Sequence, residues 1–135
     1  MTEVAPLARK LGIKPEMTAL VLNPPDGVLD LFEPLPVGAR VGVSVGRTQS
    51  DLVLLFAADA AALTQAWPTA QAAVKPGGLL WIAYPKGGRK AGTDLNRDIL
   101  WAHMQQHDLV GVTLVAIDGT WSAMRFRRPD EVGKA

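Results

Sequence analysis

The stretch from Val74 to Ile82 constrains the fold more than any other part of the chain. It reads Val-Lys-Pro-Gly-Gly-Leu-Leu-Trp-Ile, which joins a helix end to a tight glycine turn and then to a buried strand. A second apolar run, Asp51 to Phe56, also lacks a polar face. Runs of this kind are typical of strands covered on both sides, as in a parallel sheet. The sequence therefore predicts an α/β fold with these two strands at its centre.

Shorter elements are predicted before and between these strands. In chain order they are a helix from Pro6 to Leu11 that Gly12 ends, a strand from Met17 to Asn23, a brief helix from Val28 to Phe32 and a short strand from Arg40 to Val45. The alanine-rich segment from Ala57 to Val74 predicts a crossover helix that closes a right-handed βαβ unit. Pro68 is expected to break this helix or to start a second one.

The last third of the chain predicts a helix and a hairpin. Thr93 or Asp94 is expected to cap a helix that runs to about His107, with Leu95, Ile99 and Ala102 on its apolar stripe. Asp118-Gly119-Thr120 separates two strand-like runs, Val112 to Ile117 and Trp121 to Phe126, and indicates a β-hairpin. An antiparallel pair is therefore expected to end the sheet, and residues 129–135 are expected to form a loose tail.

Size and composition predict one domain that spans residues 1–135. A chain of 135 residues of which 48% are hydrophobic is typical of a single packed domain. The net charge of +1 supplies no overall attraction to nucleic acid or to an anionic membrane. The first residues do not resemble a signal peptide, the longest apolar run is too short for a bilayer, and cysteine is absent. We therefore expect a cytoplasmic protein with no membrane partner.

The order of these elements resembles the nucleotide-binding fold of S-adenosylmethionine-dependent methyltransferases, reduced to fewer strands. Met17 to Gly27 stands where their first strand and cofactor loop lie, Asp51 to Leu54 looks like their fourth strand, and Val74 to Gly78 looks like the turn before their fifth. The likeness runs roughly from Leu11 to Phe126. It implies a reduced methyltransferase-like, Rossmann-like, mostly parallel sheet with helices on both faces and a C-terminal antiparallel hairpin.

A closer resemblance is to a family of small bacterial proteins of unknown function. It is carried by four segments, Lys10 to Pro15, Val21 to Gly27, Trp81 to Lys86 and Thr120 to Phe126. Because the function of that family is unknown, the resemblance implies no activity, and a shared fold does not by itself determine function. This resemblance therefore supports the fold and leaves the function open.

The loop after the first predicted strand departs from the cofactor-loop pattern. Such a loop needs glycines so that backbone N–H groups can approach the ligand, whereas Pro24 and Pro25 have no N–H and only Gly27 remains. The end of the next strand, Val43 to Gly46, also lacks the acidic side chain that accepts hydrogen bonds from ribose hydroxyls. A local turn is the simpler interpretation of this loop.

Tyr84 to Asp94 is the best positive candidate for a site. This loop holds three cations and several glycines and leads into a predicted helix N-terminus, which attracts anions. An acidic ligand fits this pattern, and a solvated loop with cations for solubility is the competing interpretation. The candidate ligand-binding residues of both loops are Asn23, Asp26, Gly27, Tyr84, Lys86, Gly87, Gly88, Arg89, Lys90 and Thr93.

Two further patterns are weaker. His103 and His107 have the helical spacing of zinc ligands, but Met104 replaces the expected glutamate and no third ligand is evident, so we expect no metal site. Arg125 and Arg127 share a strand face with a tryptophan, which could stack a base. Charges on a terminal strand more often discourage edge-to-edge pairing, and a nucleic-acid partner is therefore not expected.

These patterns together predict a non-catalytic, methyltransferase-like domain that binds a small anionic ligand or a protein partner and holds no cofactor. The first alternative is a minimal S-adenosylmethionine-dependent methyltransferase, in which Asn23, Asp26 and Gly27 touch the cofactor while Tyr84 and the basic loop face the substrate. The second alternative is a structural subunit of a homo-oligomer, such as a homodimer, that pairs through its terminal hairpin or a tryptophan-bearing helix.

Overall fold

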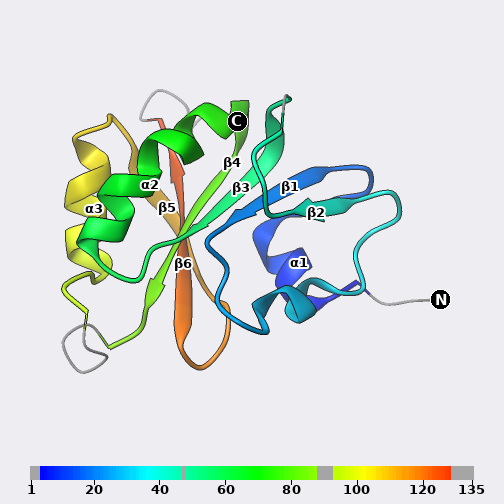
Figure 1. Ribbon diagram of the computed structural model, residues 1–135, viewed down its shortest axis with the longest axis horizontal. Helices are drawn as coiled ribbons and strands as arrows, with labels where there is room; N and C mark the ends of the chain where they lie inside the picture. Colours follow the sequence, from blue (N-terminus) through cyan, green and yellow to red (C-terminus); the bar gives the residue numbers. More distant parts are fainter. Residues whose placement is uncertain (1–3, 47, 88–92, 129–135) are drawn as a thin grey trace.

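The computed structural model describes residues 4–46, 48–87 and 93–128, in which six strands form one sheet in the order β2-β1-β3-β4-β6-β5 (Figure 1). The strands are β1 (Thr18–Leu22), β2 (Arg40–Gly42), β3 (Ser50–Phe56), β4 (Val74–Pro85), β5 (Val110–Ala116) and β6 (Trp121–Arg127). β2, β1, β3 and β4 are parallel, whereas β6 is antiparallel to both β4 and β5. The structure thus confirms a mostly parallel sheet that ends in an antiparallel hairpin.

Helices cover both faces of this sheet, as predicted (Figure 1). They are α1 (Pro6–Leu11), the 3-10 helix η1 (Val28–Phe32), α2 (Ala60–Ala73) and α3 (Arg97–Gln105). One hydrophobic cluster joins α2 and α3 to the sheet, and another joins α1 and η1 to its opposite face. Among the described residues, none of the helices is long and apolar enough to cross a membrane.

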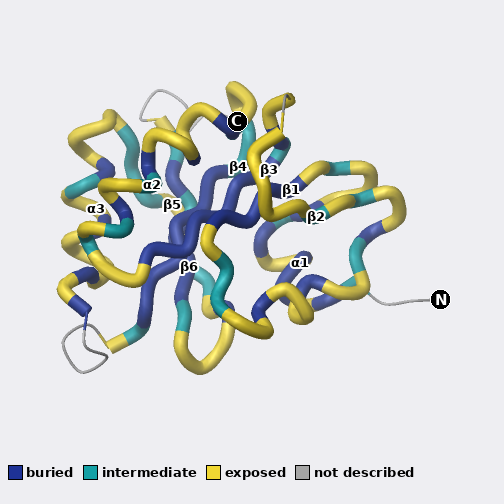
Figure 2. The backbone as a smooth tube through the Cα atoms, in the orientation of Figure 1, coloured by how far each residue is buried: buried dark blue, intermediate teal, exposed yellow. Residues whose placement is uncertain are grey.

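The two central strands are β3 and β4, and both belong to the buried centre of the molecule (Figure 2). Leu54 contributes to the cluster beneath α1, whereas its neighbour Leu55 contributes to the cluster beneath α2. Successive residues of a strand point to opposite faces, so an uninterrupted apolar run supplies both clusters at once. The Trp81 indole N–H donates to the carbonyl oxygen of Leu11 at 3.0 Å and ties β4 to α1.

α2 is continuous, so the break or restart expected at Pro68 is wrong. The helix begins where the Asp59 carboxylate accepts a hydrogen bond from Ala62 N at 2.8 Å, and it continues through Pro68 to Ala73. A proline inside a helix leaves the carbonyl group four residues earlier, here that of Thr64, without its usual donor. Both Thr64 and Pro68 are exposed, so water can satisfy that carbonyl.

The predicted glycine turn lies inside β4 as an irregularity rather than between α2 and the strand. Ser50 of β3 pairs with Val74, but Leu52, two positions later, pairs with Leu79. The extra residues of β4 include Gly77, whose φ of 75° suits glycine, and Gly78. A Cβ on Gly78 would lie 2.9 Å from the Asp51 carbonyl oxygen. The strand can therefore begin directly after the helix only because glycines bend it.

α3 begins later than predicted. Its cap is Asn96, whose side chain accepts a hydrogen bond from Ile99 N at 2.8 Å. Thr93 and Asp94 instead attach the preceding segment to the start of α2. The Thr93 hydroxyl donates to the Ala58 carbonyl at 2.6 Å, and the Asp94 carboxylate accepts from Ala60 N at 2.9 Å. Thr93 and Asp94, which the sequence predicted as helix caps, therefore form hydrogen bonds with a distant segment of the chain instead.

The predicted apolar stripe of α3 is also wrong. Its buried residues are Leu100 and Met104, whereas Ile99 is 44% exposed and Ala102 is exposed. Leu95 is buried, but it precedes the helix. Moving the helix start to Arg97 leaves Leu95 outside the helical repeat, which is why the predicted stripe does not match the buried face.

The structure confirms the predicted terminal hairpin. Asp118 Oδ1 accepts hydrogen bonds from Thr120 N and Trp121 N, both at 2.8 Å, and thereby closes the turn between β5 and β6.

β2 ends at Gly42, three residues earlier than predicted. The predicted loose tail, residues 129–135, lies outside the described residues.

Candidate functional site

The carboxyl ends of the four parallel strands meet at one edge of the sheet. From β1 the chain continues to β2 on one side, while β3 lies on its other side. Such a reversal is the topological switch point beside which open α/β sheets bind ligands. The predicted loops follow β1 and β4, which flank β3 and therefore lie about 10 Å apart. The structure thus brings both candidate loops to one edge of the sheet without joining them into one cluster.

The loop after β1 is a tight turn. Val28 N donates to the Pro25 carbonyl at 3.2 Å, and Asn23 and Gly27 have positive φ angles of 55° and 82°. The side chains of Asn23 and Asp26 are exposed, as is Gly27. The turn leads directly into η1, so these three candidates lie on an open surface.

A cavity of about 470 Å³ lies at the carboxyl end of β4. Its lining includes Tyr84, Lys86, Gly87, Asn96, Arg97 and Ser122. Tyr84, Lys86 and Gly87 come from the predicted loop, whereas the other three come from the start of α3 and from β6. The buried Thr93 is not part of the lining, and Gly88, Arg89 and Lys90 lie outside the described residues.

Three kinds of contact position the residues of this cavity, namely hydrogen bonds, a strand pairing and an ion pair. Lys86 is attached to the hairpin turn, because its backbone N–H donates to the Thr120 carbonyl at 2.8 Å and its ammonium donates to the Asp118 carbonyl. Tyr84 pairs with Ser122 across β4 and β6. Arg97 lies 3.7 Å from the Asp98 carboxylate in an exposed ion pair. Such a pair is weak in water, so Arg97 can exchange it for a ligand.

Burial raises the pKa of Tyr84 above its ordinary value, and the charge of Asp98 raises it further, although the nearby Arg97 acts in the opposite direction. The phenol therefore stays protonated at neutral pH and can donate a hydrogen bond. Together with Lys86 and Arg97, it makes this cavity suited to a ligand that accepts hydrogen bonds and carries negative charge.

Sequence reasoning missed Asn96, Arg97 and Ser122. Asn96 has a cap-forming side chain, which is a local signal for a helix start at Arg97. Ser122 carries no such signal, because its place beside Tyr84 depends on the pairing of β6 with β4 rather than on the hairpin itself.

His103 lies in α3, whereas His107 lies in the turn that follows it. Within the described residues, no group of three or more His, Cys, Asp or Glu side chains that could hold a metal ion occurs. The rings of His103 and His107 are 5.4 Å apart. Burial, and to a smaller extent His107, lowers the pKa of His103. His107 packs against Trp67 with ring centroids 5.1 Å apart.

The arginine-bearing strand β6 lies between β4 and β5, so its charges cannot serve to protect a sheet edge. That explanation is wrong because the hairpin folds with β5, not β6, outermost. Trp121 is half-buried and meets the Phe56 ring edge-on at 5.1 Å. It therefore contributes to core packing.

Comparisons with family models and with curated proteins found no match to this chain. Solved structures do match it. The ribosomal protein L11 methylase of Lactobacillus delbrueckii subsp. bulgaricus aligns over 90% of this chain and 74% of its own, with 10% identity and a TM-score of 0.56. DhpI in its SAM-HEP complex aligns over 91% and 85%, with 12% identity and a TM-score of 0.58. The M1A22 tRNA methyltransferase TrmK of B. subtilis aligns over 94% and 67%, with 7% identity and a TM-score of 0.51.

The matched structures span most of the chain, and the observed sheet has the features that the methyltransferase resemblance implied. Its parallel strands β1, β3 and β4 adjoin one another, and an antiparallel hairpin ends the sheet. At identities of 7–12% such likeness establishes the fold and no activity. The chain therefore has the methyltransferase-type Rossmann fold.

Proposed function

We propose that this chain is a non-catalytic ligand-binding domain that takes a small anionic ligand in the cavity at the carboxyl end of β4. One observation carries the proposal. Four polar side chains line the same cavity at the carboxyl ends of the parallel strands, namely Tyr84, Lys86, Arg97 and Ser122. A volume of about 470 Å³ is within the usual range for small-molecule sites.

The charges of the lining favour an anion. Lys86 and Arg97 are positive and Asp98 is negative, which leaves a net charge of +1 among the charged lining residues. The hydroxyl groups of Tyr84 and Ser122 add neutral donors. A carboxylate or phosphate would thus meet both charge and hydrogen bonds.

The first test is a titration of the protein with inorganic phosphate, in which amide NMR signals are monitored at each phosphate concentration. We expect saturable shifts at Lys86, Gly87 and Arg97. Arg97→Gln should weaken binding about fivefold, because an exposed charge pair is worth up to about 1 kcal/mol. Arg40→Gln, an exposed change on β2, should leave the affinity unchanged. Shifts that do not saturate, or equal affinities for the two variants, would overturn the proposal.

A minimal S-adenosylmethionine-dependent methyltransferase is the alternative function. It is supported by the fold of the matched structures, of which DhpI was solved with SAM. In this case the exposed loop after β1 would hold the cofactor through Asn23, Asp26 and Gly27. The two prolines of that loop, and the lack of an acidic side chain in Val43 to Gly46 after β2, support the non-catalytic proposal instead.

Native mass spectrometry with added S-adenosylmethionine separates the two functions. The non-catalytic proposal expects no saturable adduct. The methyltransferase alternative expects an adduct that Asp26→Ala weakens at least fivefold, the order of one lost hydrogen bond. Asp30→Ala, an exposed carboxylate in the neighbouring η1, is the matched control. An adduct sensitive to Asp26 alone would replace our proposal with the alternative.

A further inference from the structure

The two edges of the described sheet, β5 and β2, differ in length and in charge (Figure 1). β5 runs from Val110 to Ala116 and contains no charged residue and no proline. At about 3.4 Å per residue it is about 24 Å long. β2 has only three residues and includes the exposed Arg40. Charge or proline on an edge strand prevents its pairing with another chain. β5 therefore lacks both kinds of protecting residue.

Apolar side chains are exposed along β5. Val112 and Leu114 of the strand are 38% and 47% exposed, and Trp101 of α3 is 37% exposed. These three residues line one cavity of about 400 Å³, together with the buried Met124 of β6. The uncharged edge is thus bordered by apolar surface that a partner could cover.

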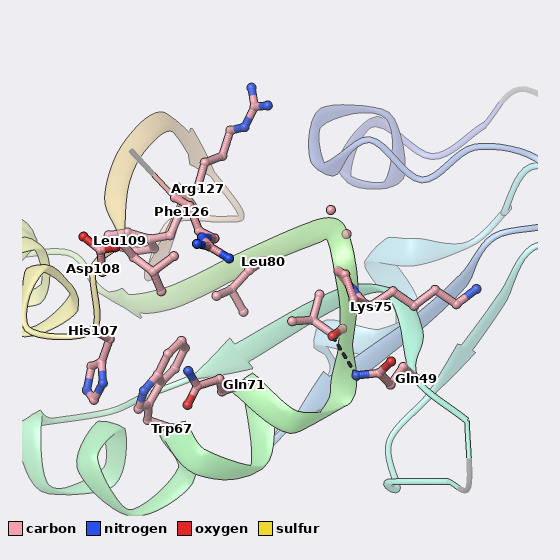
Figure 3. A pocket seen from close by; sticks show the side chains of 15 residues that line it. Gln49, Trp67, Gln71, Lys75, Leu80, His107, Asp108, Leu109, Phe126 and Arg127 are labelled. Carbon is pink, nitrogen blue, oxygen red and sulfur yellow. Dashed lines mark hydrogen bonds between the residues drawn. The ribbon is translucent and has the colours of Figure 1, made fainter. Parts of the chain in front are cut away.

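Trp101 differs from the other tryptophans in its exposure. Trp67 is 3% exposed, and Figure 3 shows it beside His107, whose ring centroid is 5.1 Å away. Trp81 is buried in β4, and Trp121 packs against the core. Tryptophan is enriched among the residues that contribute most to protein interfaces. Trp101 is therefore the tryptophan best placed to contact a partner.

Two opposite charges lie beside this apolar surface. Arg97 and Asp98, at the start of α3, line the same cavity, and the ion pair that they form at 3.7 Å is exposed. In a twofold dimer each contact occurs twice, so Arg97 of each copy can pair with Asp98 of the other. The charges at this surface are therefore complementary between two copies and do not oppose their association.

We propose that β5 pairs antiparallel with β5 of a second copy of this chain, across a twofold axis near Leu114. The register of β5 against β6 is irregular between Gly111 and Thr113 and regular from Thr113 onward. An axis at Leu114 uses the regular segment and places the two Leu114 side chains next to each other. Antiparallel pairing also keeps both α3 helices on one face of the joined sheet, where Trp101 borders the contact.

One strand and one side of a helix form a small interface, whereas stable complexes bury about 800 Å² on each partner. We therefore expect a weak dimer, with a dissociation constant on the order of 100 μM. At about 5 μM, a usual concentration for unfolding experiments, the chain would then be monomeric. The inference does not rest on the proposed anion site, although the two cavities share Arg97, Asp98 and Leu114.

The test is sedimentation velocity of the full chain from about 10 μM to 1 mM, in a buffer without phosphate. We expect the mean mass to rise toward twice that of the single chain. Leu114→Lys should raise the dissociation constant at least about tenfold, because two lysines would then meet near the axis. Val43→Lys is the matched control, since Val43 is 48% exposed and follows β2 at the other edge. If Leu114→Lys does not fold, Trp101→Ser repeats the test with an expected loss of about fivefold.

The chain contains no cysteine, so a single introduced cysteine reports which surface pairs. With a short bismaleimide, Leu114→Cys should give a covalent dimer at concentrations at which Val43→Cys gives none. A monomer over the whole range, equal weakening by Leu114→Lys and Val43→Lys, or equal cross-linking of the two cysteine variants would overturn the inference. A monomer that still binds phosphate saturably would do so and leave the proposed function intact.

Discussion

Replacing Leu54 by alanine is expected to lower the free energy of unfolding by about 3 kcal/mol. Leu54 is fully buried in the middle of β3, between β1 and β4, and it belongs to the cluster beneath α1. Its removal leaves a cavity where a strand is fixed by hydrogen bonds on both sides, so the surroundings cannot close around the gap.

Urea unfolding followed by circular dichroism measures this effect. Leu114→Ala is the matched control, because Leu114 lies on the outermost strand β5 and is 47% exposed. That change should cost less than about 0.5 kcal/mol. Equal losses for the two variants would show that β3 is not the packed centre of the sheet.

Replacing Asp51 by asparagine is expected to cost about 1 kcal/mol at pH 7, the scale of a hydrogen-bonded and partly exposed ion pair. The carboxylate accepts a hydrogen bond from Thr18 N at 2.9 Å and another from Lys75 Nζ at 2.9 Å. It thereby joins β1, β3 and the start of β4. The backbone bond first and the Lys75 contact second hold the pKa of Asp51 below its ordinary value.

The pH dependence of this second effect has a definite sign. A carboxyl group with a lowered pKa in the folded state stabilises the protein above its unfolded pKa, about 3.9, and loses that contribution as the pH falls through the folded value. The difference between wild type and Asp51→Asn should therefore persist at pH 7 and shrink below about pH 4. Asp30→Asn, at an exposed position of η1, should show no comparable difference. A gap that grows on acidification would contradict the assignment.

Much of the fold was predictable because its signals are local. Gly12 ends α1 with a φ of 90°, which glycine adopts without strain. The Asp118 turn closes the hairpin through its own neighbours. The apolar run of β3 likewise indicates a strand buried on both faces. Where the cause was tertiary, prediction failed: Thr93 and Asp94 resemble caps, but their bonding partners lie in the segment that begins α2.

The candidate site, like the fold, could be predicted only in part from the sequence. The rule that ligands bind at the carboxyl ends of parallel strands pointed to Tyr84, Lys86 and Gly87, which do line a cavity. The same rule pointed to Asn23, Asp26 and Gly27. These residues form an exposed turn, and their role in ligand binding stays a prediction. The predicted homodimer likewise stays a prediction.

The sequence by itself determined which segments are strands and helices and that the sheet is mostly parallel, since periodicity, glycine and turn residues act on their near neighbours. Only the tertiary structure decided which side chains share a cavity. Ser122 lies beside Tyr84 because β6 pairs with β4, and Trp67 meets His107 because the turn after α3 lies against α2. Those pairings depend on contacts between segments far apart in the chain, which no local pattern encodes.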